Sequence, residues 1–157
     1  MSNAARPLIL ASPDATAALA RRFGTALRAG DTLLLQGDIG AGKSYFARAL
    51  IQSLQDIPED VPSPTFTLVQ TYDTRLGELW HADLYRLGDP GEVEELGLTE
   101  ALTSAICLIE WPDRLGTLTP SAAAVLTFNI LEREEHRSIT LTGQNCDLMR
   151  RLSKAMT

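Results

Sequence analysis

One short motif restricts the fold of this chain more than any other feature. Residues 37–44 read GDIGAGKS and match the pattern G-x-x-x-x-G-K-[ST] at every defined position. The preceding residues 32–36 (TLLLQ) form a short, apolar stretch between two glycines, as in a strand buried on both faces. The following residues 43–54 carry apolar side chains at helical spacing. A strand, a glycine-rich turn and a helix in this order predict a phosphate-binding loop (P-loop) within an α/β fold.

The residue types in the motif suit a bound phosphate. Glycines let the backbone adopt dihedrals that other residues avoid, and the N–H groups of the turn then point inward at an anion. The positive end of the helix dipole is directed at the same place. We expect Lys43 to reach the β- and γ-phosphates of a nucleotide and the Ser44 hydroxyl to ligate Mg²⁺. The other loop residues expected to bind the nucleotide are Asp38, Ile39, Gly40, Ala41 and Gly42.

A P-loop also needs a carboxylate that holds the metal and its water shell or acts as a base. Two acids directly follow apolar stretches that are typical of strands: Asp83 after residues 79–82, and Glu110 after residues 106–109. Ligands of open α/β sheets bind at the carboxyl ends of the strands, which favours both residues as functional. The alternative for each is an ordinary acid at a strand end that caps a turn or forms an ion pair.

The remaining sequence predicts a single-domain α/β protein, residues 1–157, with a mixed sheet and helices on its faces. Residues 1–6 are expected to be flexible or to derive from a tag. The first helix is expected over residues 13–28, capped by Ser12, with Pro13 at its first position and Gly30 ending it. Further expected elements are strands at 65–72, 79–84, 105–109, 124–131 and 137–141, short helices within 90–103, a hairpin loop at 73–77 and a closing helix at 147–155.

Composition narrows the class of partner. The net charge is −6 and Lys and Arg total only 14, so we expect contact with RNA to pass through a protein partner. No apolar run reaches 18 residues and no signal peptide is apparent, so neither a membrane span nor secretion is expected. The two cysteines, Cys107 and Cys146, lie far apart and fit a reducing compartment. We therefore expect a cytoplasmic protein.

Four sequence blocks together resemble the bacterial TsaE family, formerly called YjeE. They are residues 37–44 (GDIGAGKS), 63–69 (SPTFTLV), 81–87 (HADLYRL) and 108–112 (LIEWP), and the resemblance extends over nearly the whole chain. It implies a P-loop ATPase that takes part in making threonylcarbamoyladenosine beside the anticodon of certain tRNAs. In that family the protein does not transfer the carbamoyl group; it associates with a TsaB–TsaD pair, and ATP hydrolysis is thought to reset that complex between turnovers.

The resemblance also assigns roles to residues of the central motifs. It implies that Gly40, Gly42 and Lys43 bind the phosphates of ATP. Ser44 takes the Mg²⁺ position, where many members have Thr and where either hydroxyl can ligate the metal. Glu110 matches the acidic Mg²⁺ position of the family.

Outside these positions the assignments are looser. Asp83 matches a catalytic or water-positioning carboxylate. Thr65 lies in a proline-rich segment that resembles a switch, with entry to a strand held by prolines as the alternative. Arg133 and Arg137 lie where the family contacts the nucleotide, but either one fits a solvated surface charge. For six further residues both a functional and a structural role stay open: Asp14, Thr16, His81, Tyr85, Arg86 and Trp111. For His81 we favour an ordinary strand residue over a catalytic base.

The expected activity is a Mg²⁺-dependent ATPase that is slow alone and stimulated by its partner. A small-molecule P-loop kinase is the main alternative, but no arginine cluster that would form a lid is present. A GTP-binding switch is disfavoured because the Asn-Lys-x-Asp signature is absent, and a scaffold with a vestigial loop is disfavoured by the intact Lys43 and Ser44.

Overall fold

The computed structural model describes residues 7–64, 67–89 and 91–157. The expectations for residues 1–6 and for Thr65 therefore lie outside the described residues. In chain order the elements are β1 (Leu8–Leu10), α1 (Pro13–Ala26), β2 (Thr32–Gln36), α2 (Lys43–Ser53), β3 (Val69–Thr74), β4 (Gly77–Asp83), α3 (Gly91–Glu95), α4 (Leu98–Ser104), β5 (Ile106–Glu110), the 3₁₀ segment η1 (Pro112–Leu118), β6 (Ala124–Ile130), β7 (Arg137–Gly143) and α5 (Cys146–Ala155).

All described strands belong to one seven-stranded mixed sheet. Its order is β1-β7-β6-β2-β5-β4-β3. The strands β4, β5, β2 and β6 run parallel to one another, whereas β3, β7 and β1 are attached in antiparallel fashion at the two sides. The expected α/β class with a mixed sheet is confirmed.

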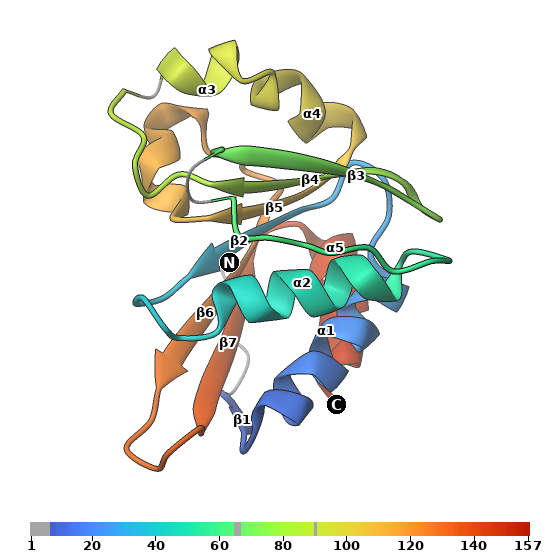
Figure 1. Cartoon of the computed structure of the whole chain (residues 1–157), viewed down its shortest axis with the longest axis vertical. Helices are drawn as coiled ribbons and strands as arrows, with labels where there is room; N and C mark the ends of the chain where they lie inside the picture. Colours follow the sequence, from blue (N-terminus) through green and yellow to red (C-terminus); the bar gives the residue numbers. More distant parts are fainter. Residues whose placement is uncertain (1–6, 65–66, 90) are drawn as a thin grey trace.

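Helices cover both faces of the sheet (Figure 1), with α1, α2 and α5 on one face and α3 and α4 on the other. Alternate side chains of β2 divide between the two layers: Leu33 and Leu35 belong to the core under α1, α2 and α5, and Leu34 belongs to the core under α3 and α4. The two-sided burial explains why this strand is almost wholly apolar rather than alternating.

The helices that flank the P-loop follow their local sequence signals. The Ser12 hydroxyl caps α1 by accepting a hydrogen bond from the Ala15 N–H at 3.2 Å, and Pro13 occupies the first turn. The helix stops before Arg28 because Leu27 already has an extended conformation (ψ 153°). The helix α2 begins at Lys43, with Gly42 in the left-handed region as its N-terminal cap. Among the described residues, no helix combines the length and apolar character needed to cross a bilayer.

Other expectations for secondary structure also need correction. The strand expected from residue 65 begins only at Val69, because Leu68 adopts a positive φ of 66° that interrupts an extended strand. The sequence analysis also missed β1, whose three residues pair with β7, and η1, which follows β5 directly. The hairpin between β3 and β4 is tighter than expected, since Thr74 and Gly77 already pair across it.

Candidate functional site

The site residues meet at the carboxyl ends of three neighbouring parallel strands, β2, β5 and β4. The P-loop leaves the end of β2, and Asp83 and Glu110 are the last residues of β4 and β5. In the register of the sheet, Leu35 pairs with Glu110 and Glu110 pairs with Asp83. Alternation places Asp83 and Glu110 on the face that carries Leu79 and Leu108, which is also the face covered by α2. Residues far apart in sequence thus converge on the start of α2.

The P-loop glycines hold the backbone in conformations that other residues rarely adopt. Gly37 has a φ of +148°, and a Cβ atom there would lie 2.6 Å from the Phe128 carbonyl oxygen of β6. Gly40 and Gly42 have φ values of +83° and +103°, and a Cβ atom at either glycine would meet no atom of the described residues within 4 Å. The loop is therefore held closely against the sheet at Gly37 and left open at the two later glycines, where a phosphate can approach the backbone.

Lys43 lies inside this loop rather than in solvent. Its ammonium donates a hydrogen bond to the Gly37 carbonyl oxygen and lies 3.7 Å from the centroid of the Trp111 ring. Burial lowers the pKa of Lys43, although the nearby carboxylates of Glu110 and Asp83 act in the opposite direction. A desolvated cation between a carbonyl and an aromatic ring gains strongly from a bound anion, which suits the expected role of Lys43.

Ser44 and Glu110 meet directly at the N-terminus of α2. The Ser44 hydroxyl donates to the Glu110 carboxylate, with distances of 2.9 Å to Oε1 and 3.0 Å to Oε2. Glu110 is almost fully buried, and its Oε2 also lies 2.7 Å from Nε2 of His81. A hydroxyl and a carboxylate are oxygen ligands of the kind that Mg²⁺ prefers, so Ser44 and Glu110 fit the expected metal position. Within the described residues no group of three or more His, Cys, Asp or Glu side chains is placed to hold a metal ion.

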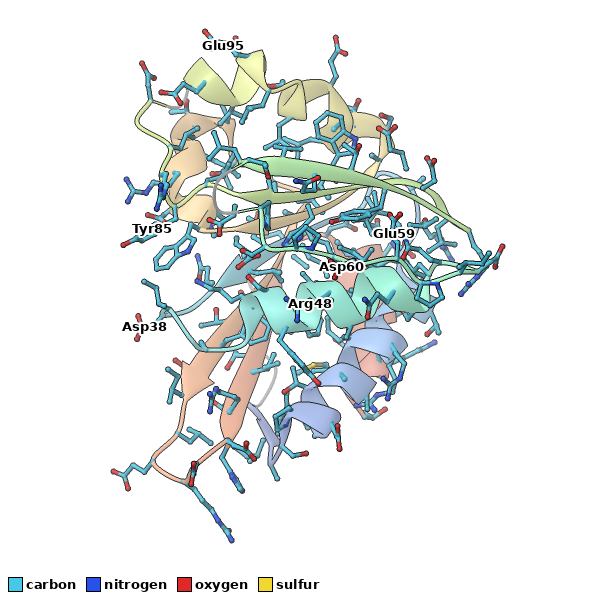
Figure 2. All side chains as sticks on the ribbon, in the orientation of Figure 1. Asp38, Arg48, Glu59, Asp60, Tyr85 and Glu95 are labelled. Carbon is cyan, nitrogen blue, oxygen red and sulfur yellow. The ribbon has the colours of Figure 1, made fainter. Side chains whose placement is uncertain are left out.

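A cleft of about 470 Å³ opens above these groups. Its lining includes Lys43, Ser44, Asp83 and Glu110, with Tyr85 and Trp111 at one side. The Asp83 carboxylate accepts a hydrogen bond from the Tyr85 backbone N–H at 3.0 Å, and the Tyr85 and Trp111 rings pack with centroids 4.8 Å apart. Figure 2 shows Tyr85 and Asp38 projecting from the same side of the molecule, beside the P-loop.

A second cavity of about 300 Å³ adjoins the P-loop on the α1 side. Thr16, Tyr45 and Arg137 line it together with Gly40 and Gly42, and the Arg137 guanidinium donates to the Gly40 carbonyl oxygen at 3.2 Å. This position brings Arg137 next to the expected nucleotide. Arg133 is instead exposed on the β6–β7 turn and is not among the described residues that line either cavity.

The other predicted loop residues differ in what they present to a ligand. Asp38 and the 71% exposed Ile39 form the outer tip of the P-loop. The Ala41 side chain is buried in the core under α1 and α2, so only its backbone faces the cradle.

The sequence did not single out one residue of the site, Tyr45, and it favoured an ordinary strand role for another, His81. Tyr45, one residue after Ser44, lines both cavities. His81 contacts Glu110, and a signal for this existed: it precedes Asp83 by two positions and therefore shares its face of β4.

Comparisons with known proteins agree on one family. The family model described as "Threonylcarbamoyl adenosine biosynthesis protein TsaE" matches residues 10–139. The tRNA threonylcarbamoyladenosine biosynthesis protein TsaE of Rickettsia bellii is 37% identical over 136 residues, covering 87% of this chain and 94% of the relative. The protein of the same description from Bacillus subtilis is 34% identical over 135 residues, covering 84% and 82%.

A solved structure has a closely similar fold. The crystal structure of Bacillus subtilis YdiB superposes with a TM-score of 0.80 at 27% identity, covering 100% of this chain and 99% of the other. This likeness extends over the whole sheet and its helices, beyond the residues of the P-loop alone. The chain belongs to the TsaE family of threonylcarbamoyl adenosine biosynthesis proteins, in agreement with the resemblance of its four sequence blocks.

Proposed function

We propose that this chain binds ATP with Mg²⁺ and hydrolyses it as an accessory step in tRNA N6-threonylcarbamoyladenosine formation, acting with a TsaB–TsaD type complex. Membership of the TsaE family supports the pathway. The nucleotide, the metal, the hydrolysis and the partner complex are inferred from the site and from the family resemblance. The tRNA itself is expected to be contacted only through the partners.

The observation that carries the proposal is the contact between Ser44 and Glu110. These residues come from the start of α2 and the end of β5, yet the hydroxyl lies within 3.0 Å of both carboxylate oxygens. A hydroxyl directly after the P-loop lysine and an acid at the end of a neighbouring strand are the two protein groups that a nucleotide-bound Mg²⁺ uses. When bound, the ion would neutralise charge on the β- and γ-phosphates.

The residues around this pair supply the other requirements of phosphoryl transfer. Lys43 offers a partly desolvated cation to the phosphates, and the open backbone at Gly40 and Gly42 offers N–H groups. Asp83 lines the same cleft and is our candidate for orienting the attacking water. No arginine is assigned to the transition state, so we expect slow turnover by the chain alone. An arginine supplied by a partner is worth about 10³–10⁵ in rate.

The test is phosphate release from ATP by the purified chain, with and without a TsaB–TsaD pair. Wild type is expected to release phosphate slowly alone and much faster with the pair, and Lys43→Ala is expected to lose both activities. Glu110→Ala is expected to weaken the Mg²⁺-dependent turnover. Full stimulated activity in Lys43→Ala would contradict the assignment of the site.

The same assay distinguishes the proposed ATPase from the main alternative, a small-molecule kinase. A small-molecule kinase would release little phosphate and would transfer it to an added acceptor, producing ADP and a phosphorylated product. An absence of partner stimulation together with acceptor-dependent ADP formation would replace the proposed ATPase by a kinase.

A further inference from the structure

We infer that His81 is a positioning residue that holds the Glu110 carboxylate in the orientation required for the Mg²⁺–nucleotide complex. The inference rests on the proposed function, because it concerns the same metal position. It assigns a role to a buried residue that the sequence alone favoured as an ordinary part of a strand.

The contact is specific in geometry. Nε2 of His81 lies 2.7 Å from Oε2 of Glu110, and the side chains are only 1% and 3% exposed. Both come from neighbouring parallel strands, with His81 paired to Leu108 and Asp83 paired to Glu110. The histidine therefore approaches the carboxylate from the sheet, while Ser44 approaches it from α2.

The two oxygens of the Glu110 carboxylate have different hydrogen-bond donors. An ionised carboxylate can only accept, so we assign the proton of His81 to Nε2, and Oε2 is then held by a buried ring of β4. The Ser44 hydroxyl spans both oxygens and can rotate, whereas the imidazole cannot turn away without moving a buried ring. Among the described residues, Oε1 thereby has only the Ser44 hydroxyl as a hydrogen-bond donor, and it is the oxygen that would remain available to a metal ion.

The burial of the ring argues against a role in packing alone. Among the described residues, Nδ1 of His81 is buried without a hydrogen-bond partner, so Glu110 provides the polar contact that offsets desolvation of the imidazole. An apolar side chain would fill this position at lower cost if packing were its purpose. A donor that orients a ligand from behind is instead a common second layer of a metal site, and its loss typically costs about 10–100-fold in metal affinity.

Two substitutions of similar polarity separate positioning from packing. In His81→Gln the amide nitrogen can reach the place of Nε2 and keep the donor to Glu110. In His81→Asn the amide ends near the place of Nδ1 and cannot reach the carboxylate. The pair differs by one methylene group, so a general effect of removing the ring would appear in both variants.

The experiment measures the affinity of a non-hydrolysable ATP analogue by calorimetry across a Mg²⁺ titration, with thermal unfolding as a check on folding. We expect His81→Asn to raise the Mg²⁺ concentration at half-maximal effect by about 10-fold or more. We expect His81→Gln to remain within about 3-fold of wild type, and analogue affinity without Mg²⁺ to change little in either variant.

Each outcome decides a different question. Wild-type Mg²⁺ dependence in His81→Asn, or an equal loss in both variants, would overturn the positioning role and leave the proposed function intact. A wild-type protein whose analogue affinity ignores Mg²⁺ would overturn the proposed function together with the inference.

A measurement on the unmodified chain tests the inference even if the variants fail to fold. The sequence contains only two histidines, His81 and His136, so their ring nitrogens can be resolved by ¹⁵N NMR. The inference requires a proton on Nε2 of His81 that exchanges slowly with water. An Nε2 without a proton would overturn it.

Discussion

The ammonium of Lys43 lies 3.7 Å from the centroid of the Trp111 ring, so the P-loop cation rests on the residue that directly follows Glu110. Trp111 adopts a left-handed backbone conformation (φ 57°, ψ 53°), which is unusual for a large side chain and turns the ring back over the cleft. Trp111 therefore both lines the cleft and contacts the Lys43 ammonium, which is the group expected to bind the phosphate.

We therefore expect nucleotide binding to change the fluorescence of Trp111. A phosphate draws the Lys43 ammonium toward itself and alters the cation–π contact with the ring. The chain has two tryptophans, Trp80 and Trp111, so the variants Trp80→Phe and Trp111→Phe isolate each emitter. Titration with ATP and Mg²⁺ should change the emission of Trp80→Phe and leave that of Trp111→Phe unaltered. A change in Trp111→Phe together with unaltered emission in Trp80→Phe would contradict this role of Trp111.

The lowered pKa of Lys43 makes the stability of the nucleotide-free protein depend on pH. Burial disfavours the ammonium, so the folded chain releases this proton at lower pH than the unfolded chain, for which the reference value is 10.5. Between the lowered pKa and 10.5 the unfolded chain binds more protons, and the free energy of unfolding therefore rises with pH. Below the lowered pKa the cost of the charged lysine is fully present.

Lys43→Met tests this sign. The variant should exceed wild type in the free energy of unfolding at about pH 7, and the difference should shrink as the pH approaches about 10. Urea denaturation at both pH values measures the difference, and Lys154→Met controls for the loss of an exposed positive charge. A gap that grows with pH would contradict burial as the dominant effect on Lys43.

The parts of the fold that were predictable from sequence are those with strong local signals. Buried strand β2 was predicted with its observed bounds because it is almost wholly apolar and lies between two glycines. The strand β1 gives no such signal: it has three residues and exists through pairing with the distant β7 near the other end of the chain. The prediction of the start of β3 was wrong for a related reason. The alternation of residues 65–72 continues through Leu68, whose positive φ depends on its tertiary surroundings.

The candidate site also has features that local sequence predicts and features that it does not. The P-loop and the two strand-end acids were predictable because each is marked by its own short sequence context. The contact of His81 with Glu110 depends on the register of β4 against β5, and the packing of Trp111 over Lys43 depends on a left-handed residue; neither is encoded in local periodicity. Arg137 and Arg133 lie near the same turn, yet only Arg137 reaches the P-loop backbone in the described structure.

Two P-loop glycines should respond differently to alanine. In Gly37→Ala the new methyl group would meet the Phe128 carbonyl at 2.6 Å, so β6 or the loop must move. In Gly40→Ala the methyl group points into open space, and the cost is the left-handed strain of about 1–2 kcal/mol. We expect a larger loss of unfolding free energy in Gly37→Ala, measured by urea denaturation. Equal losses would contradict the close approach of Gly37 to β6.

The last prediction concerns an ion pair away from the site that ties α5 to the start of β2. Arg151 contacts Asp31 through two hydrogen bonds, Nη1–Oδ2 at 2.8 Å and Nη2–Oδ1 at 3.2 Å, with side chains 13% and 11% exposed. The hydrogen bond to Asp31 is the main reason that the pKa of Arg151 is raised. Both residues of the pair also bind the backbone at the end of α1: Arg151 donates to the Ala26 carbonyl, and Asp31 accepts from the Arg28 N–H.

Asp31→Asn should therefore destabilise the fold without touching the cleft. The asparagine oxygen can still accept from the Arg28 N–H, but the nearly buried guanidinium loses the less exposed of its two charged partners and keeps only Asp147, at a cost of about 3 kcal/mol. For a domain of this size, that corresponds to a fall in Tm of about 6–12 °C. The matched control is Asp147→Asn, which removes a more exposed partner of the same Arg151 and should cost much less. Adding Arg151→Met to Asp31→Asn should recover part of the lost stability, because the nearly buried guanidinium that has lost Asp31 is then removed. A further drop in Tm would show that the arginine stabilises the fold mainly through its other contacts, which include Asp147 and the Ala26 carbonyl.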